Sequence, residues 1–425
     1  MRVDNALKRK LPRIACVGAE ALTLSHGTGI MFGRHLANYP RTKVVDLHFQ
    51  TFADQYLFRN MHVPRYNLNY AQWKDPWINA LNSCLKGGSR PKGTSLIYDQ
   101  HVFSPLQVDW DEIGGQPDLI YSTCYSAADF AFLHHVYRNL PKKVPIVQHF
   151  LDLDLRAYNN MISLYRELQP AIVALWTLTD PIRYAVEPFG IMKAEMVQAL
   201  QQPLSKNYKK RHRKFSKDFR PVIIGNIWSG SAYQTLHSLW SSCQDKFDHL
   251  PPINWYGHPR RFHELKHMGI TVRANDRIVR DAGFLSKQAL NKSLMNADMG
   301  IVAFSGETID RDEYTKYSLP SRIGDYCANG LPIVVISQKG TEPWRYVQDH
   351  GIGIALDPAD MKKAKRDLSH FIFDRDWRAE CGENARKFAE RELDLKKYQS
   401  KLYPRLIELA QHEIPQQFLQ KRFAP

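Results

Sequence analysis

The chain has 425 residues, of which 44% are hydrophobic and 12% are aromatic. This length suits two domains of about 200 residues each, and the apolar content excludes an intrinsically disordered protein. The formal net charge of +15 at pH 7 implies an anionic partner, which is a phospholipid surface, a nucleic acid or a phosphorylated substrate, unless the excess charge only solvates a linker.

Membrane spans, metals and disulfides are not expected from this sequence. No apolar run approaches the ~20 residues that cross a bilayer, and the N-terminal segment lacks the apolar core of a signal peptide. The six cysteines are scattered without a CxxC pair, and neither they nor the histidines have the spacing of a metal site. Cys16 and Cys327 lie inside apolar segments, which predicts buried, reduced thiols in a cytoplasmic protein.

Apolar, β-branched runs recur along the first half, and each precedes a segment with helical periodicity. These runs are residues 13–18, 43–49, 95–99, 118–123, 144–150 and 171–178. Short strands that alternate with helices predict a parallel sheet covered on both faces.

A glycine-containing segment, SHGTGIMFG at 25–33, follows the first predicted strand. Its glycines are one residue too far apart for the dinucleotide fingerprint G-x-G-x-x-G, which argues against NAD. We expect instead a loop whose backbone approaches an acceptor or a phosphate, with these candidate residues: Ser25, His26, Gly27, Thr28 and Gly29.

The strand–helix pattern restarts after a basic stretch that has no apolar periodicity. The second set of predicted strands covers residues 221–228, 253–257, 270–274, 299–305, 331–337 and 351–356. Residues 377–410 have the pattern of one or two long amphipathic helices. The sequence therefore predicts an α/β protein with two doubly wound parallel-sheet domains, residues 1–205 and 219–395, joined by a basic linker at 206–218.

The segment KYSLPSRIGDYCANGLPIVV at 316–335 is the most informative stretch. Pro320 suits the first turn of a helix and Ser318 suits its cap, while Leu319, Ile323 and Cys327 form an apolar stripe. Unpaired amides at such a helix start, together with the Arg322 guanidinium, predict a diphosphate site. An ordinary capped helix would explain the same residues without a ligand.

This segment resembles the donor-binding segment of GT-B glycosyltransferases, above all the retaining family four (group 1). Further stretches at 25–36, 221–228, 282–304 and 350–358 resemble the same family in the expected order, so that the resemblance covers nearly the whole chain, although only 316–335 is specific. It implies a GT-B fold with two Rossmann-like domains that face each other across a cleft. It also implies a C-terminal helix, residues 396–425, that returns to the first domain.

The resemblance implies a donor site in the second domain. Tyr317 and Asp325 occupy the positions of the family's two glutamates, and the usual Arg/Lys pair is missing from GNIWSGSAYQ at 225–234. The diphosphate charge would be met by Arg322, by amides at Ser229 and Gly230, or by Lys316 and Arg311 upstream, with Asp325 on the ribose. The expected donor-binding residues are Gly225, Asn226, Ser229, Gly230, Tyr317, Ser318, Leu319, Pro320, Ser321, Arg322 and Asp325.

In the first domain the resemblance points to the end of the strand at 144–150. Asp152 matches the aspartate of the family's His-Asp pair, Leu151 replaces the histidine, and His149 faces either the cleft or the core. Asp152 and His149 are therefore the expected catalytic residues.

The resemblance implies sugar transfer, with retention, from a nucleotide-diphosphate-sugar donor to a glycan or lipid-linked acceptor, as in polysaccharide biosynthesis. It also implies that no metal and no cofactor are required. Basic clusters at 8–13 and 206–214 suggest peripheral binding to an anionic membrane face from the cytoplasm. Three alternatives stay open: a protein that binds or modifies nucleic acid, another GT-B-type enzyme such as an epimerase or phosphorylase, and an inactive GT-B-like scaffold.

Overall fold

The computed structural model describes a large part of the chain. The described residues are 5–18, 27–48, 65–67, 110–111, 115–125, 127–153, 158–187, 192–204, 219–227, 229–247, 250–257, 262, 266, 270–304 and 317–415. The strand predicted at 95–99, the linker predicted at 206–218, and the residues Ser25, His26, Arg311 and Lys316 lie outside these ranges.

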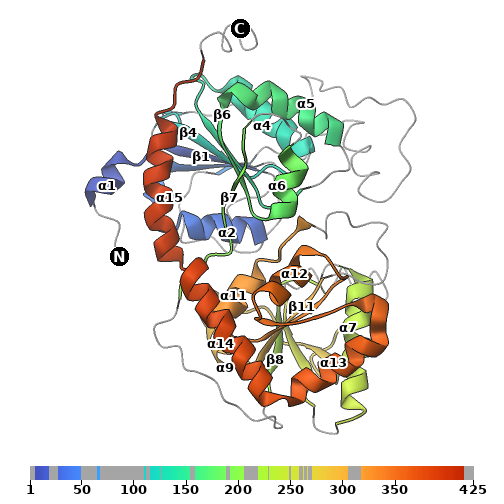
Figure 1. Ribbon diagram of the computed structural model, residues 1–425. Helices are drawn as coiled ribbons and strands as arrows, with labels where there is room; N and C mark the ends of the chain where they lie inside the picture. The colour runs from blue at the N-terminus through green and yellow to red at the C-terminus, as the bar shows by residue number, and fades with distance from the viewer. Residues whose placement is uncertain are drawn as a thin grey trace. The chain divides into compact units, whose positions relative to one another are not determined.

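The chain forms two compact units, each with its own parallel sheet (Figure 1). Unit 1 comprises Met1–Val197 and Gln399–Pro425, and unit 2 comprises Gln198–Tyr398. Two parallel sheets with flanking helices confirm the predicted α/β, GT-B-like architecture.

Unit 1 holds a seven-stranded sheet in the order β3-β2-β1-β4-β5-β6-β7, and its paired strands are parallel. The strands are β1 Ile14–Gly18, β2 Val44–His48, β3 Arg65–Asn67, β4 Leu119–Ser122, β5 Ile146–Phe150, β6 Ile172–Thr177 and β7 Glu195–Met196. The helices are α1 Asn5–Lys10, α2 Gly27–His35, α4 Ala127–Asn139, α5 Tyr158–Leu168 and α6 Asp180–Val186. Short 3₁₀ helices occur at Arg41–Lys43 and Gln169–Ala171.

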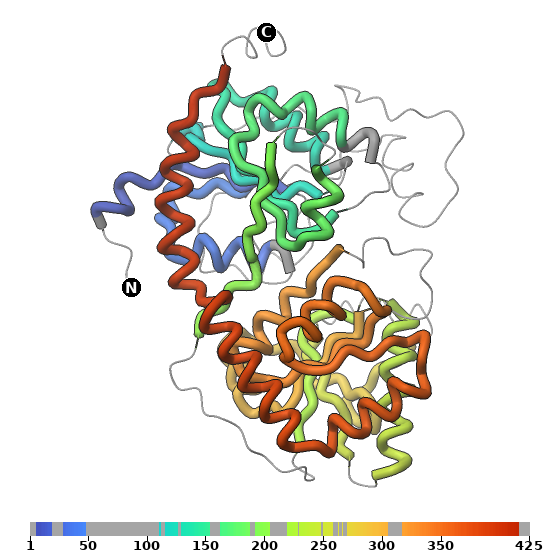
Figure 2. Tube along the Cα trace, viewed as in Figure 1, coloured from blue at the N-terminus to red at the C-terminus, as the bar shows by residue number. Residues whose placement is uncertain are grey.

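Two helices close the chain, α14 Arg375–Glu392 and α15 Leu395–Ala410, which are the last long segments of the trace in Figure 2. The chain passes from unit 2 to unit 1 within α15. In unit 1, the Gln399 amide donates to the carbonyls of Arg34 and His35 at the end of α2. The Tyr403 hydroxyl also donates to the His35 carbonyl, at 3.0 Å, so that α15 satisfies the carbonyls that end α2.

Unit 2 holds a six-stranded parallel sheet in the order β10-β9-β8-β11-β12-β13. The strands are β8 Pro221–Ile224, β9 Ile253–Tyr256, β10 Val279–Asp281, β11 Met299–Ala303, β12 Ile333–Ile336 and β13 Gly353–Leu356. The further helices are α7 Gly230–Gln244, α9 Lys287–Asn296, α11 Arg322–Ala328, α12 Glu342–Asp349 and α13 Met361–Phe373, with a 3₁₀ turn at Pro358–Asp360.

Helices cover both faces of the unit 2 sheet because strand side chains alternate in direction. Met299 and Ile301 of β11 join a buried cluster with the apolar faces of α7 and α13. Gly300, between them, faces the opposite side, where it lies against the ring of Tyr326 on α11. Helix α11 therefore packs on one face of the sheet, and α7 and α13 pack on the other.

Most of the predicted strands are confirmed, but the one predicted at 270–274 is wrong. The edge strand of unit 2 is β10, which begins nine residues further on, although Ile270 is buried. The Asp276 carboxylate accepts hydrogen bonds from the amides of Ile278 and Val279. This turn places Val279, rather than Ile270, opposite Ile253 of β9.

Other sequence expectations concern the cysteines and membranes. Cys16 and Cys327 are buried free thiols, as predicted. Among the described residues, no helix has the length and apolarity that a membrane span requires. Of the two basic clusters, only 8–13 lies within the described ranges, and membrane docking stays a prediction.

Candidate functional site in unit 2

The carboxyl ends of β8 and β11 form the topological switch point of the unit 2 sheet. From β8 the order runs through β9 to β10 on one side, and through β11 to β13 on the other. Strands β8 and β11 pair only at Met299–Pro221 and Gly300–Val222, so that they part towards their carboxyl ends. Ligands of doubly wound sheets bind in the crevice beyond such a point.

The turn after β8 brings two predicted donor-site residues together. Gly225 has φ +73°, a conformation that favours glycine, and its amide donates to the Tyr256 carbonyl at 3.0 Å. The Trp255 indole donates to the Gly225 carbonyl at 2.7 Å. A Cβ placed at Gly225 would lie 4.0 Å from Arg322 Cζ, so that the guanidinium lies beside this turn.

The amino end of α7 follows the same turn. Ser229 caps α7, since its Oγ accepts from the Ala232 amide at 3.1 Å and contacts Ser231 Oγ at 3.0 Å. The amides of Gly230 and Ser231 are the first in a helix of 15 residues and precede its internal hydrogen-bond ladder. Asn226, Ser229 and Gly230 are half-buried, and Gly225 is exposed. Helix α7 therefore presents its positive end next to the Gly225 turn.

The helix predicted to start near Ser318 begins instead at Arg322, which corrects the basis of the sequence hypothesis. Ser321 is the residue before α11, and its side chain makes no capping hydrogen bond. The amides of Ile323 and Gly324 donate to the carbonyls of Pro320 and Ser321. These two amides are thus already used, and α11, with seven residues, offers little of the predicted amide cradle.

The side chains around the start of α11 are nevertheless placed for a polar ligand. Arg322 is 7% exposed and Ser318 is 4% exposed. Among the described residues, no hydrogen-bond partner of Ser318 Oγ is found. Tyr317, Ser321 and Asp325 are half-buried, while Leu319 and Pro320 are buried. The predicted apolar stripe is confirmed by the burial of its three residues, Leu319, Ile323 and Cys327.

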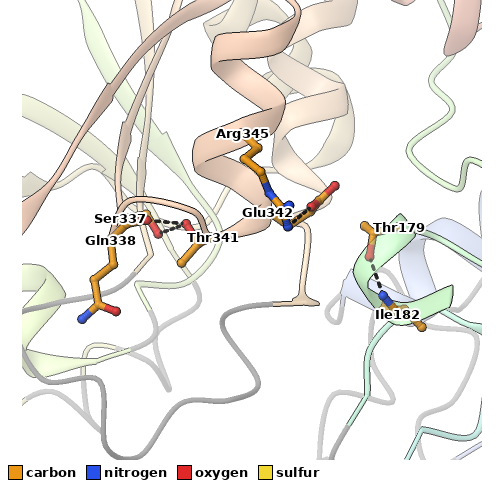
Figure 3. Close-up of polar contacts among 7 residues, drawn as sticks. All are labelled: Thr179, Ile182, Ser337, Gln338, Thr341, Glu342 and Arg345. Atoms are coloured by element: carbon orange, nitrogen blue, oxygen red, sulfur yellow. Dashed lines mark hydrogen bonds and ion pairs between the residues drawn. The ribbon is translucent and has the colours of Figure 1, made fainter. Parts of the chain in front are cut away.

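Sequence reasoning missed the turn between β12 and α12, which ends at the same edge of the sheet. Ser337 and Thr341 are buried, and their hydroxyls lie 2.7 Å apart, with Thr341 Oγ1 donating to the Gln338 carbonyl (Figure 3). Glu342, which follows, pairs with Arg345 at 3.1 Å. The sequence signal was a polar segment with a glycine, SQKGT, directly after an apolar strand.

In unit 1, the predicted catalytic His149 lies in the core. It is 0% exposed, and its ring packs among Phe32, Tyr121 and Trp176. The Nε2–H donates to the Val197 carbonyl at 3.2 Å, so that Nδ1 accepts from the Tyr121 hydroxyl at 3.1 Å. Both ring nitrogens are engaged in hydrogen bonds within the core. Of the two orientations that the sequence left open, His149 therefore faces the core and not a cleft.

The pKa of His149 is lowered to about 3, mainly by burial and secondly by the nearby His35. The hydrogen bond to the Val197 carbonyl raises the pKa by a smaller amount. His149 therefore binds a proton below about pH 6.5 in the unfolded chain but only below about pH 3 in the folded chain. We expect the free energy of unfolding to fall with decreasing pH in this window, by up to ~1.4 kcal/mol per pH unit from this group.

His149→Gln removes this titration while it keeps an N–H for the Val197 carbonyl, and it should flatten the pH dependence of denaturant unfolding between pH 6 and 4. The exposed His412→Gln is the control and should keep the wild-type slope. Equal slopes for His149→Gln and wild type would contradict the assignment.

The other predicted residues of unit 1 are only partly described. Asp152 is half-buried after β5, next to the buried Leu151. The expected loop at 27–29 is wrong, because Gly27, Thr28 and Gly29 form the first turn of α2. Helix α6, later in the sequence of unit 1, is capped by Thr179, whose Oγ1 accepts from the Ile182 amide (Figure 3).

The fold is that of the GT-B glycosyltransferases. Residues 251–388, which include β9 and α11, match the sequence model of the glucosyltransferase 3-like C-terminal domain. This match supports the predicted resemblance to glycosyltransferases, whereas membership of family four is not tested and stays a prediction. Comparison with curated protein sequences gives no match.

Three solved structures illustrate the likeness in fold. HepE from Anabaena with UDP-glucose shares 13% identity at a TM-score of 0.60, over 93% of this chain and 100% of that one. A TarM variant from S. aureus in complex with fondaparinux, α-GlcNAc-glycerol and UDP shares 11% sequence identity at a TM-score of 0.55. The match covers 94% of this chain and 99% of the TarM chain. The α,α-trehalose 6-phosphate synthase of Burkholderia multivorans shares 11% sequence identity at a TM-score of 0.56. The match covers 94% of this chain and 97% of the synthase chain.

Proposed function

We propose that this protein is a glycosyltransferase that binds a nucleotide-diphosphate-sugar at the Gly225 turn of unit 2 and transfers its sugar to a glycan or lipid-linked acceptor. The observation that carries the proposal is the Arg322 guanidinium beside Gly225, at the switch point of the sheet. The family match over residues 251–388 supports the same class of enzyme.

The site has the chemistry to hold a diphosphate without a metal. Arg322 keeps its charge at any physiological pH and can donate two parallel hydrogen bonds to phosphate oxygens. The amides that open α7, shortly after the Gly225 turn, add hydrogen-bond donors, and the dipole of α7 adds positive potential. When the bond to the sugar breaks, negative charge grows on the leaving diphosphate, and preorganised donors stabilise that charge.

Neighbouring side chains extend the proposed site beyond the diphosphate. Asp325, one turn after Arg322 on α11, is half-buried and would accept hydrogen bonds from the ribose hydroxyls. The buried Ser318 hydroxyl, in the segment before α11, adds a further donor. Retention of the anomeric configuration is part of the proposal, with no nucleophile assigned, and Asp152 of unit 1 stays the proposed catalytic residue near the reacting sugar.

UDP is the first nucleotide to test, because the HepE structure contains UDP-glucose. We expect UDP or UDP-glucose at 100-fold above its dissociation constant to stabilise unit 2 by about 2.7 kcal/mol, which raises the melting temperature of a unit of this size by roughly 5–10 °C. GDP-, ADP-, CMP- and dTDP-sugars complete the panel.

Two measurements separate the alternatives, namely the melting temperature with each nucleotide and the release of nucleotide diphosphate with and without an acceptor. Release of free nucleotide diphosphate only with an acceptor present indicates a transferase, and binding without turnover indicates an inactive scaffold. No shift with any nucleotide, together with binding to DNA or RNA that weakens with salt, would overturn the proposal in favour of a nucleic-acid-binding protein.

A further inference from the structure

Tyr326 is buried in α11 and is placed between the two strands that form the switch point. Its ring lies against Gly300 of β11, where an added Cβ would come within 2.6 Å of the ring carbons. The sequence thus provides a glycine in the middle of a buried strand, and the space is filled by an aromatic side chain from the helix. The ring can reach the strands only because Gly300 lacks a side chain.

The Tyr326 hydroxyl bridges β8 and β11 where their own pairing has ended. It accepts from the Ile224 amide at 3.1 Å and donates to the Ile301 carbonyl at 3.1 Å, with the Val222 carbonyl at 3.5 Å. Backbone pairing of these strands stops at Gly300–Val222. The hydroxyl therefore replaces the missing backbone hydrogen bonds and acts as a spacer between the parting strands.

The protonation state of the hydroxyl suits this double role. Burial raises the pKa of Tyr326 well above its usual value, against smaller opposing effects of Arg322 and of the backbone hydrogen bonds. The phenol is thus a neutral donor and acceptor throughout the physiological pH range. A neutral hydroxyl can serve an amide and a carbonyl at once, which an ionised phenolate cannot.

The position of Tyr326 links the two halves of the proposed phosphate site. Ile224, whose amide it accepts, directly precedes Gly225. Arg322 lies one helical turn before Tyr326 on α11, and its guanidinium reaches the Gly225 turn. One side chain thus fixes the strand end that carries the turn and the helix that carries the cation.

We propose that Tyr326 is a positioning residue of the nucleotide-sugar site, which holds the Gly225 turn in register with the Arg322 guanidinium by bridging β8 and β11. This inference rests on the proposed function. Tyr326 does not touch the donor, and it acts through the geometry of two groups that do. Trp255 supports the same turn from β9 through its hydrogen bond to the Gly225 carbonyl.

Tyr326→Phe in the full chain tests the inference because it removes one oxygen atom and keeps the ring that fills the space over Gly300. We expect the dissociation constant for UDP, measured by calorimetry, to rise about 10-fold, since small displacements of positioned groups are costly. In turnover, the donor KM should rise by a similar factor, while the acceptor KM stays within about twofold of wild type.

Tyr403→Phe is the matched control. Tyr403 is also buried, and its hydroxyl donates to a backbone carbonyl, that of His35, but in unit 1. Both variants should lower the melting temperature, because each loses a buried hydrogen bond. Only Tyr326→Phe should weaken UDP binding, a difference that a purely structural role for Tyr326 would not produce.

If Tyr326→Phe does not fold, Trp255→Phe provides the second test. It removes the indole N–H from the carbonyl of the exposed Gly225 and should also raise the UDP dissociation constant several-fold. If the variant that folds, Tyr326→Phe or in its place Trp255→Phe, binds UDP as tightly as wild type, the inference is overturned and the proposed function still stands. Failure of the wild-type chain to bind any nucleotide of the panel overturns both.

Discussion

Arg322→Ala is expected to weaken UDP binding by about 30- to 1,000-fold, which corresponds to roughly 2–4 kcal/mol for the charge-assisted hydrogen bonds lost at a largely buried site. The guanidinium lies beside the Gly225 turn and is only 7% exposed, so water and salt screen it little. Calorimetric titration of the full chain with UDP measures the effect directly. Arg322→Lys should recover only part of the affinity, because a point charge cannot form the paired hydrogen bonds of a guanidinium.

The control for charge is Arg366→Ala, on the exposed surface of α13. Arg366 pairs with Asp367, and its side chain is 72% exposed, so that its removal changes the net charge of unit 2 by the same amount. We expect wild-type affinity for UDP in this variant. An Arg322→Ala protein that remains folded and binds UDP as tightly as wild type would place the diphosphate elsewhere.

The parts of the fold that the sequence predicted are those set by local pattern. Runs of buried β-branched residues between helical segments identified most strands of both sheets, since a parallel strand is apolar on both faces. The edge strand β10 was missed because only its first residue, Val279, is buried, and the Asp276 turn sets its register. An edge strand lacks the two-sided apolar signal that identifies a central one.

The residues of the candidate site stay a prediction, but the geometry that the sequence suggested at the start of α11 is wrong. Pro320 and Ser318 suggested the first turn of a helix, yet Ser318, Leu319 and Pro320 are buried before α11, which begins at Arg322. Tertiary burial of this short segment outweighed the local preference for a helical start. The predicted amide cradle at α11 therefore gives way to the Arg322 side chain and the amino end of α7, which the sequence had offered as one of several sources of positive charge.

Long-range contacts explain what the sequence could not reveal. The Tyr326 bridge joins residues about a hundred positions apart, and nothing local distinguishes this tyrosine from an ordinary core residue. His149 shows the opposite case, because a histidine at the end of a strand suggested catalysis, whereas Tyr121 and Val197 hold it as a neutral core residue. The role of a polar side chain depends on partners that only the fold brings close.

The position of α11 is fixed by contacts on several sides, which makes its glycine a sensitive point. A Cβ at Gly324 would overlap the Leu200 carbonyl, which lies in the segment that leads from β7 into unit 2. That segment cannot easily yield, because Gln202 exchanges backbone hydrogen bonds with Leu393 and Leu395. At the other end of α11, the Arg386 guanidinium donates to the Ala328 carbonyl at 2.6 Å.

Gly324→Ala is therefore expected to lower the free energy of unfolding by roughly 2–4 kcal/mol, despite the better helix propensity of alanine. Gly324 lies two residues after Arg322, so that any shift of α11 that relieves the overlap also moves the guanidinium from the Gly225 turn. UDP affinity should fall along with stability, and denaturant unfolding with calorimetry on the same sample measures both.

Gly33→Ala on α2 is the matched control, since it is also a helical glycine but an added Cβ there meets no atom of the described residues within 4 Å. It should gain up to ~1 kcal/mol from helix propensity and leave UDP binding unchanged. If Gly324→Ala behaves like Gly33→Ala, the packing of α11 against the Leu200 carbonyl is not what holds Arg322 in place. A loss of stability with unchanged UDP affinity would instead mean that α11 keeps its position at the site while the segment at Leu200 gives way.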